Sequence, residues 1–186
     1  CIRDSNYAYF QVLSDVALWQ PRALPALIRE LEWLHRGQGL ELYWREHATC
    51  PTESEYADMV VHKTGGLFRV ALCLMDSVAD TDAAPFMPLA NLLGLLFQIR
   101  DDYLNLQPPS ACDDITEGKF SFPLIHAVRT AKDATLLTML QQHTQDPALK
   151  QQAVAYMQDV TNSFAYTRDV WHLSLIHISE PTRLRR

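Results

Sequence analysis

Four polar side chains interrupt a very apolar helical pattern in the segment 94-GLLFQIRDDYLNL-106. Their spacing is i, i+3, i+4 and i+7, which places all four on one face of an α-helix. These residues are Gln98, Asp101, Asp102 and Asn105. A helix end that emerges into solvent is one explanation. The better explanation is a buried helix that presents an oxygen-rich stripe to Mg²⁺, because burying an ionised carboxylate is costly without a cation, and Mg²⁺ prefers oxygen ligands.

A lysine interrupts the apolar stripe of another predicted helix. Lys63 lies on that stripe and is followed by Thr64 and then by Gly65 and Gly66. A glycine pair in a helix interior costs about 2 kcal/mol, so it needs a reason. The lysine could simply extend its ammonium to the surface, beside an incidental kink. Alternatively, the ammonium points into a cavity, and the glycines let a backbone or a ligand approach closely.

Two further polar residues fit the same cavity. Lys119 lies in the loop 116-TEGKFSFP-123, and Gln38 takes an apolar helix position between Gly37 and Gly39. Taken alone, a loop lysine is usually solvated, and a core glutamine is usually satisfied by neighbours. Together with the acidic stripe, these groups predict a cavity in which carboxylates hold a divalent cation, the cation bridges to phosphate, and lysines neutralise the remaining charge. That arrangement suits a diphosphate.

The elements that must position these groups are helices. Apolar residues recur at three- and four-residue spacing, and Thr52 with Glu55 forms a capping box. We expect helices near 5–19, 24–45, 53–78, 89–106, 123–131, 134–143 and 147–171, with a break at 82–88 and a loop at 107–123. No strand, repeat or low-complexity segment is predicted. The expected class is therefore all-α, in one packed domain.

Composition excludes several classes of function. The chain has 186 residues, is 48% hydrophobic and has a formal charge of −6, which argues against nucleic acid as a partner. No run approaches the roughly 20 apolar residues of a membrane span, and the first residues do not form a signal-peptide pattern. The cysteines lie far apart, at positions 1, 50, 73 and 112. They predict reduced thiols and a cytoplasmic protein.

Both ends of the sequence are unusual. The helical pattern is already under way at Cys1, so we expect residues 1–173 to be the C-terminal part of one domain. Residues 174–186 leave that pattern and resemble the translated read-through of a sequencing adapter. We therefore exclude this tail from arguments about the fold.

Four segments, in order and sensibly spaced, together resemble one family. They are 35-HRGQGLELYWRE-46, 62-HKTGGLF-68, 97-FQIRDDYLNL-106 and 114-DITEGKFSFPLIHA-127. They are similar to the trans-prenyltransferases, and in particular to eukaryotic geranylgeranyl diphosphate synthases. The resemblance runs from about residue 5 to 172. It implies an isoprenoid synthase helical bundle, here without its N-terminal helices, that forms a homodimer or a higher oligomer.

The resemblance also implies a reaction and roles for the polar residues. The reaction is Mg²⁺-dependent condensation of isopentenyl diphosphate with an allylic diphosphate, with farnesyl diphosphate giving geranylgeranyl diphosphate. Asp101 and Asp102 would be the metal-binding and catalytic carboxylates, with Asp101 binding magnesium directly or through water and Asp102 supporting it. Lys63 would also be catalytic. Contacts to the allylic diphosphate would come from Lys63, Thr64, Gln98 and Lys119, supported by Gln38 and Asn105.

Three features depart from the family pattern. The first aspartate-rich motif, D-D-x-x-D, is absent from these residues and would lie before Cys1, so we expect this chain alone to be inactive. Glu41 stands where the family usually has aspartate. The loop 107–113 is short and lacks a lysine that is common there.

Other functions remain open at this stage. The chain could be a non-catalytic or regulatory prenyltransferase-like subunit, or the prenyltransferase half of a chimeric terpene synthase. A more remote alternative is a carboxylate-bridged di-metal helical bundle, because Glu32-x-x-His35 has the required spacing. The nearest second motif for such a bundle is Asp169-x-x-His172.

Overall fold

The computed structural model describes residues 2–79, 82–107, 112–131 and 134–179, with side chains from 7 to 173. Ten α-helices and two short 3₁₀ helices make up the regular structure of these residues, and no strand is present among them. The elements are α1 (Ile2–Trp19), η1 (Pro21–Ala23), α2 (Leu24–Glu46), α3 (Glu53–Lys63), α4 (Gly65–Ala79), η2 (Ala84–Phe86), α5 (Met87–Asn105), α6 (Asp113–Glu117), α7 (Phe122–Thr130), α8 (Thr135–Gln141), α9 (Pro147–Asp159) and α10 (Ser163–Ser179). The all-α prediction is confirmed.

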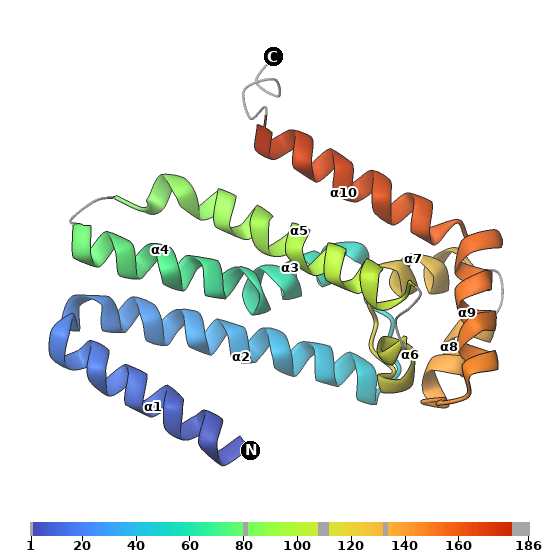
Figure 1. The fold of residues 1–186 in the computed structure, drawn as a ribbon, viewed down its shortest axis with the longest axis horizontal. Helices are drawn as coiled ribbons and strands as arrows, with labels where there is room; N and C mark the ends of the chain where they lie inside the picture. The colour runs from blue at the N-terminus through green and yellow to red at the C-terminus, as the bar shows by residue number, and fades with distance from the viewer. Residues whose placement is uncertain (1, 80–81, 108–111, 132–133, 180–186) are drawn as a thin grey trace.

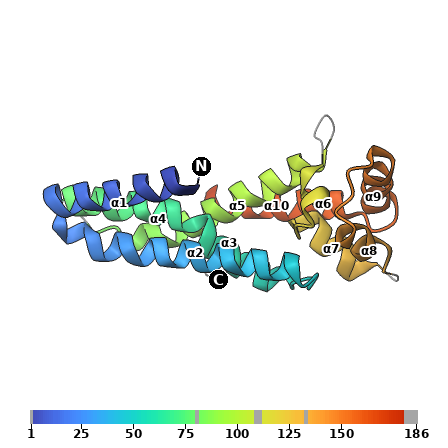
Figure 2. The same ribbon diagram turned by 90° about the horizontal axis from the view of Figure 1, so that it is seen from below.

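The long helices lie side by side. α2 packs against α3 and α4, α4 packs against α5, and α5 packs against α10, with α1 on the outer side of α2 (Figure 1). The short helices α6 to α9 gather at one end of this array, as Figure 2 also shows. The main core lies where the two parts meet, around Tyr56, Ile99, Leu106 and Leu124. A smaller core of Val16, Ala23 and Leu27 lies beneath α1.

Local signals explain most helix boundaries. The predicted capping box is present at the start of α3, because Thr52 Oγ1 accepts from the Glu55 amide (3.1 Å) and Glu55 Oε2 accepts from the Thr52 amide (2.7 Å). Gly118 follows α6 with a positive φ of 68°, a conformation that glycine adopts without strain. This one-turn helix lies inside the stretch that we expected to be an uninterrupted loop. Residues 108–111 of that stretch lie outside the described residues.

Two predicted helices are each broken in two. The expected helix 53–78 stops at Lys63 and restarts at Gly65, where α5 lies so close that a Cβ atom on Gly94 would be 2.6 Å from Cα of Gly65. The expected helix 147–171 is interrupted after Asp159. Asn162 has a φ of 52° there, and asparagine tolerates this left-handed conformation better than most residues do.

The last helix is anchored to the rest of the fold by its first turns. The ring of Tyr166 stacks on His126, with centroids 4.0 Å apart, and its hydroxyl donates to Glu53 Oε2 (2.8 Å) across 113 residues of sequence. Ser163 Oγ lies 2.8 Å from Nδ1 of His126. α10 extends through Ser179, into the excluded tail, whose residues 180–186 lie outside the described part. Of the helices that the structure describes, none is both long and apolar enough to cross a membrane.

Candidate functional site

A polar cavity of about 430 Å³ lies among the C-terminal halves of α2, α3 and α5 and the short helix α6. Its lining consists almost entirely of charged and amide side chains. They are Gln38, Glu41, Arg45, Lys63, Asn105, Asp113, Asp114, Glu117 and Lys119. Four of the eight predicted site residues therefore line one cavity, although they come from three helices and a loop.

Glu41 organises the α2 side of this cavity. Its Oε2 atom lies 2.6 Å from Nζ of Lys63 and accepts a hydrogen bond from Nε2 of Gln38 (3.0 Å). The helices come this close because Gly37 has no side chain, since a Cβ atom there would lie 2.8 Å from the backbone nitrogen of Lys63. The residue noted above as a departure from the family pattern thus has a defined role, holding the ammonium of Lys63 and the amide of Gln38 in place.

Asp102 is the most highly coordinated carboxylate of the site, and it is completely buried. Its Oδ2 atom accepts from the Tyr56 hydroxyl (2.6 Å) and from the backbone amide of Phe122 (2.9 Å). Its Oδ1 atom accepts from Nε2 of Gln98 (2.9 Å) and from Nζ of Lys119 (3.0 Å). A carboxylate has about four acceptor positions, and all of those of Asp102 are occupied by protein donors.

A continuous chain of polar contacts runs through Asp102 from one wall of the site to another. Thr64 Oγ1 donates to Oε1 of Gln98 (2.8 Å), whose amide group reaches Asp102. On the other side, the ammonium of Lys119 contacts Asp102 and also Oδ1 of Asp114 (3.3 Å). The positions of the predicted diphosphate contacts Thr64, Gln98 and Lys119 therefore depend on one another.

Burial and pairing shift the titration of this cluster. Burial opposes the charge on Lys119, but the carboxylates of Asp102 and Asp114 outweigh that effect and raise the pKa of Lys119. Burial also raises the pKa of Asp114 to about 6, with Lys119 acting in the opposite direction. Lys119 is therefore a cation at neutral pH. The pKa of Asp114, about 6, lies close to neutral pH.

The two adjacent aspartates point in different directions. We expected both to face Lys63 across an enclosed space, but Lys63 pairs with Glu41 and Asp102 pairs with Lys119. Asp101 is exposed, because neighbouring residues on a helix project about 100° apart. Asp101 shares its exposed stripe with three apolar side chains of α5 at four-residue spacing, Leu89, Leu93 and Phe97.

The glycine pair at the start of α4 makes room for protein, not for a ligand. A Cβ atom on Gly94 would lie 2.6 Å from Cα of Gly65, so the backbones of α4 and α5 touch there. A Cβ atom on Gly65 would in addition lie 3.1 Å from Nη1 of Arg69. Of the two explanations that the sequence left open, close approach of another backbone is the one that applies.

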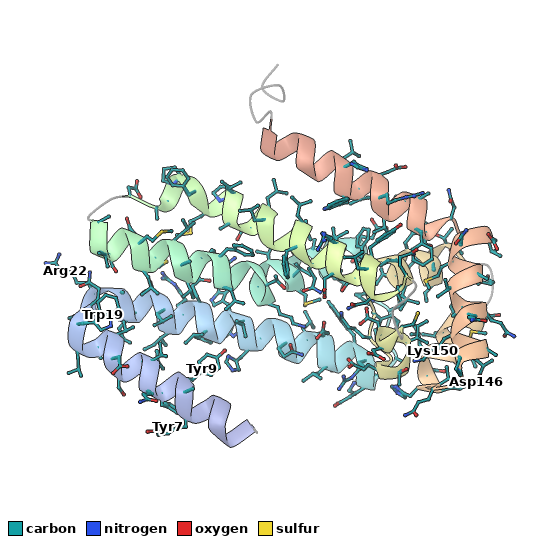
Figure 3. All side chains as sticks on the ribbon, viewed as in Figure 1. Tyr7, Tyr9, Trp19, Arg22, Asp146 and Lys150 are labelled. Atoms are coloured by element: carbon teal, nitrogen blue, oxygen red, sulfur yellow. The ribbon has the colours of Figure 1, made fainter. Side chains whose placement is uncertain are left out.

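A separate apolar groove of about 450 Å³ shares only α2 with the polar cavity. It lies between α1, α2 and α4 and is lined by Ala8, Tyr9, Val12, Leu13, Leu27, Leu31, Leu67 and Val70. Figure 3 shows Tyr9 on the side of α1 that faces α2, and Tyr7 on the outer side. Leu31 in the groove and Gln38 in the cavity are seven residues apart on α2, or roughly 10 Å along the helix. The groove and the cavity therefore lie about two turns apart along α2.

A comparison with known families identifies this arrangement. The family described as Polyprenyl synthetase matches residues 1–157. The chain belongs to the polyprenyl synthetase family. The resemblance drawn from the four segments is confirmed, and with it the expected isoprenoid synthase type of all-α fold.

Curated relatives of this polyprenyl synthetase chain have related names. It is 47% identical over 177 residues to a geranylgeranyl pyrophosphate synthase of Hypoxylon pulicicidum, covering 91% of this chain and 46% of that protein. It is 46% identical over 185 residues to geranylgeranyl pyrophosphate synthase 1 of Zymoseptoria tritici, covering 91% and 54%. A copalyl diphosphate synthase of Talaromyces verruculosus is 46% identical over 177 residues, covering 91% and 18%. The chain spans about half the length of the two geranylgeranyl pyrophosphate synthases and 18% of the copalyl diphosphate synthase.

The donor set of this polyprenyl synthetase chain suits a hard cation only if other ligands contribute. No group of three or more His, Cys, Asp or Glu side chains converges into a metal site within the described ranges. However, the buried Oδ2 atom of Asp114 accepts no hydrogen bond from the described residues, and the exposed carboxylate of Asp101 is accessible. Such scattered oxygens fit Mg²⁺, which keeps several waters and shares its coordination with phosphate.

The di-metal alternative has no support in the geometry. Glu32 and His35 are both exposed on α2, where Glu32 pairs with Arg36 (2.7 Å) and His35 lies against the backbone of its own helix. Asp169 and His172 are exposed on α10. These motifs therefore do not meet in a bundle interior.

Several residues that line the cavity were not predicted from the sequence. Arg45, Asp113, Asp114 and Glu117 line the cavity but read as ordinary surface residues in a helix end and a polar loop. Tyr56 carries a detectable signal, because a tyrosine at the centre of an apolar helix stripe needs a partner for its hydroxyl. That partner is Asp102, and no local pattern indicates it.

Proposed function

We propose that the protein to which this chain belongs condenses isopentenyl diphosphate with an allylic diphosphate, using farnesyl diphosphate to make geranylgeranyl diphosphate. In this proposal, the chain supplies the part of the site that holds the allylic substrate. The observation that carries the proposal is the presence of a charged cavity and an apolar groove about two turns apart along α2. An allylic diphosphate has the same division into a charged head and a hydrocarbon tail.

The cations of the cavity would stabilise the leaving group. When the allylic C–O bond breaks, negative charge develops on diphosphate, and fixed positive groups lower the barrier most effectively. Lys63 and Lys119 are such groups, because Glu41 and Asp102 hold their ammoniums in fixed directions. The Thr64 hydroxyl would add a hydrogen bond. Gln98 and Asp102 would act by positioning, and Gln38 and Asn105 would complete the polar lining.

Magnesium would supply the positive charge that the cavity lacks. The lining has four carboxylates and three cationic side chains, so a diphosphate meets a net negative surface without a divalent ion. Asp101 is exposed and does not line the cavity, so it would hold Mg²⁺, directly or through water, together with a diphosphate that extends from the cavity, with Asp102 in support through the groups that it positions. The ion would neutralise the diphosphate oxygens during ionisation.

The groove would receive the hydrocarbon tail. Its walls are aliphatic apart from the ring of Tyr9, and they exclude water from the part of the substrate next to the reacting carbon. The isopentenyl double bond then attacks the allyl cation, and a proton is lost to the released diphosphate. This chemistry needs no side-chain nucleophile.

Binding of inorganic pyrophosphate to the 186-residue chain tests the proposal. Calorimetry in the presence of Mg²⁺ should detect binding, and Lys63→Met and Lys119→Met should each weaken it at least tenfold. Arg36→Gln is the matched control, because Arg36 is a surface cation on α2, and this variant should bind like wild type. The absence of binding, or equal binding by the lysine variants, would contradict the proposal.

We also propose that the chain alone does not turn over, because D-D-x-x-D does not occur in its 186 residues. Incubation with Mg²⁺, farnesyl diphosphate and radiolabelled isopentenyl diphosphate should give no prenyl product. Steady turnover would overturn this part of the proposal without affecting the binding site.

A second function, with the same ionisation chemistry, is supported by one relative. It is an IDS-like terpene synthase 1 of Melampsora lini, 44% identical over 185 residues. A terpene synthase would release a cyclised or rearranged hydrocarbon from the allylic diphosphate alone. Products of the longer protein, with and without isopentenyl diphosphate, distinguish the two functions.

We further propose a homodimer or higher oligomer and a cytoplasmic location. The outer side of α1 supports association, because it exposes the large apolar side chains Tyr7, Phe10 and Leu18, of which Figure 3 labels Tyr7. Light scattering at several concentrations tests the oligomer. The free thiols of Cys50 and Cys73 support the location.

A further inference from the structure

The break between α3 and α4 determines where the proposed diphosphate contacts point. Lys63 is the last residue of α3, and Thr64 alone separates it from α4. The Thr64 amide donates to the Val60 carbonyl (2.8 Å) in the normal helical manner, but the Leu67 amide donates to the Thr64 carbonyl three residues back (3.3 Å). The backbone is therefore tightened at this point, and a change in the break would move both side chains.

One buried guanidinium spans this break. Arg69, in the second turn of α4, is 8% exposed, and its Nη1 atom donates to the carbonyl of Val61 in α3 (2.8 Å) and to Oδ1 of Asn91 in α5 (2.5 Å). Its Nε and Nη2 atoms both contact Oε2 of Glu30 in α2 (2.8 and 2.7 Å). A single side chain thus fixes four helices relative to one another around the break.

The local sequence leaves space for this contact. A Cβ atom on Gly65 would lie 3.1 Å from Nη1 of Arg69, and one on Gly66 would lie 3.6 Å from Nη2. A side chain at Gly65 would crowd the guanidinium, whereas a Cβ atom at Gly66 would make an ordinary van der Waals contact with it. A buried charge is also costly unless it is fully paired, and Glu30, Asn91 and the Val61 carbonyl together provide that pairing.

Arg69 is not part of the polar cavity itself. It lines a separate cavity of about 230 Å³ together with Glu30, His62 and Asn91, whereas Lys63 faces the diphosphate cavity. The shortest route from Arg69 to the cavity is therefore the backbone at Lys63 and Thr64.

We propose that Arg69 is a positioning residue for the diphosphate site. Its guanidinium holds the α3–α4 break in one geometry and thereby directs Lys63 into the cavity and the Thr64 hydroxyl toward Gln98. The inference rests on the proposed function only in taking those two residues as diphosphate contacts. The geometric part, that Arg69 controls the break, stands independently.

The test compares Arg69→Gln, Arg69→Lys and the control Arg36→Gln in the 186-residue chain. Arg36 also pairs with a glutamate, Glu32, but on the surface, with side chains 72% and 56% exposed. The first measurement is amide hydrogen exchange at residues 61–68. Arg69→Gln should speed exchange there at least tenfold and leave the first turn of α10 unchanged. Arg69→Lys should show a smaller change, and Arg36→Gln none.

The second measurement is pyrophosphate affinity with Mg²⁺ for Thr64→Ala, Arg69→Gln and the double variant. If Arg69 acts through the break, Arg69→Gln weakens binding about tenfold, and adding Thr64→Ala causes little further loss. If Arg69 only stabilises the fold, the double variant should lose affinity by the product of the two single losses. Asn91→Ala, which removes one partner of the guanidinium, provides the same comparison if Arg69→Gln does not fold.

The outcomes separate the two proposals. Unchanged exchange at 61–68, or fully multiplicative losses of affinity, would overturn the role of Arg69. A wild-type chain that does not bind pyrophosphate would count against the proposed function, while the exchange experiment would still decide whether Arg69 controls the break.

Discussion

The carboxylate of Asp102 lies 3.0 Å from the ammonium of Lys119, with the carboxylate completely buried and the lysine side chain 14% exposed. The pair joins α5 to the turn before α7, and the backbone amide of Phe122 donates to the same carboxylate. The position of the cavity cation is thus set by the acidic group behind it. The pair also borders the main hydrophobic core, because the core residues Tyr56 and Phe122 both donate hydrogen bonds to Asp102.

Asp102→Asn should therefore unfold more easily than wild type. The substitution leaves Lys119 largely buried with a weakened partner, and breaking a buried pair in this way costs roughly 3–5 kcal/mol in the free energy of unfolding. Asp101→Asn, the exposed neighbour, should change it by less than about 0.5 kcal/mol. Urea denaturation of the three proteins measures both effects, and equal effects would show that the buried pair does not stabilise the fold.

Glu41→Gln should make pyrophosphate binding less dependent on Mg²⁺. The substitution removes one of four carboxylates from the cavity and releases the ammonium of Lys63, so an anion meets less repulsion and an extra free cation. We expect affinity without Mg²⁺ to rise about tenfold, as measured by calorimetry in EDTA. Glu32→Gln on the exposed side of the same helix is the control and should have no effect. An unchanged metal dependence in Glu41→Gln would contradict this electrostatic account.

Asp114→Asn should change how stability depends on pH. Burial raises the pKa of Asp114 from 3.8 to about 6, so the folded state prefers the protonated form. An acid whose pKa is raised on folding contributes stability below its unfolded pKa and loses it as pH rises through the folded value. Between pH 4 and 7, Asp114→Asn should therefore gain up to about 3 kcal/mol relative to wild type.

Thermal and urea unfolding across that pH range measure this gain. Asp113→Asn, at the exposed neighbouring position of α6, serves as control and should follow wild type at each pH. A stability difference for Asp114→Asn that does not vary with pH would show that the carboxyl group is not disfavoured by burial.

Two glycines on α2 should respond to alanine in opposite directions. A Cβ atom on Gly37 would lie 2.8 Å from the Lys63 backbone nitrogen, so Gly37→Ala should destabilise the protein by about 1–3 kcal/mol and weaken pyrophosphate binding. Gly39 has no atom within 4 Å of such a Cβ, so Gly39→Ala should stabilise the helix by about 0.5–1 kcal/mol. Melting temperatures of the two variants check the contrast, and destabilisation by both would refute the packing argument.

The fold was largely predictable from the periodicity of apolar residues. The errors in the predicted helices are two missed breaks. The positions of the long helices depend on local spacing and caps, such as Thr52 with Glu55, and these were correct. The breaks at Thr64 and near Asn162 were missed. At Thr64 the break depends on the close approach of Gly94 and on the pairing of Arg69 with Glu30 and Asn91, and these three partners are distant in sequence.

The site was predictable as a set of residues but not as a set of pairs. The sequence indicated that Lys63, Gln98, Asp102 and Lys119 belong together. Gln98 and Lys119 both contact Asp102, and Lys63 lines the same cavity as Lys119. It could not indicate that Lys63 would pair with Glu41 or that Asp101 would be exposed. The choice of partner depends on how α2, α3 and α5 rotate against one another, and no local pattern encodes that rotation.

The bond between Tyr166 and Glu53 has a consequence for synthesis of the protein on the ribosome. Its partners are 113 residues apart, and translation at 5–20 residues per second separates their appearance by on the order of 10 s. Until α10 has been made, α5 and α7 lack the helix that packs on them, and the ring of His126 lacks its stacking partner Tyr166. A chaperone that binds apolar segments as they leave the exit tunnel would meet its target here.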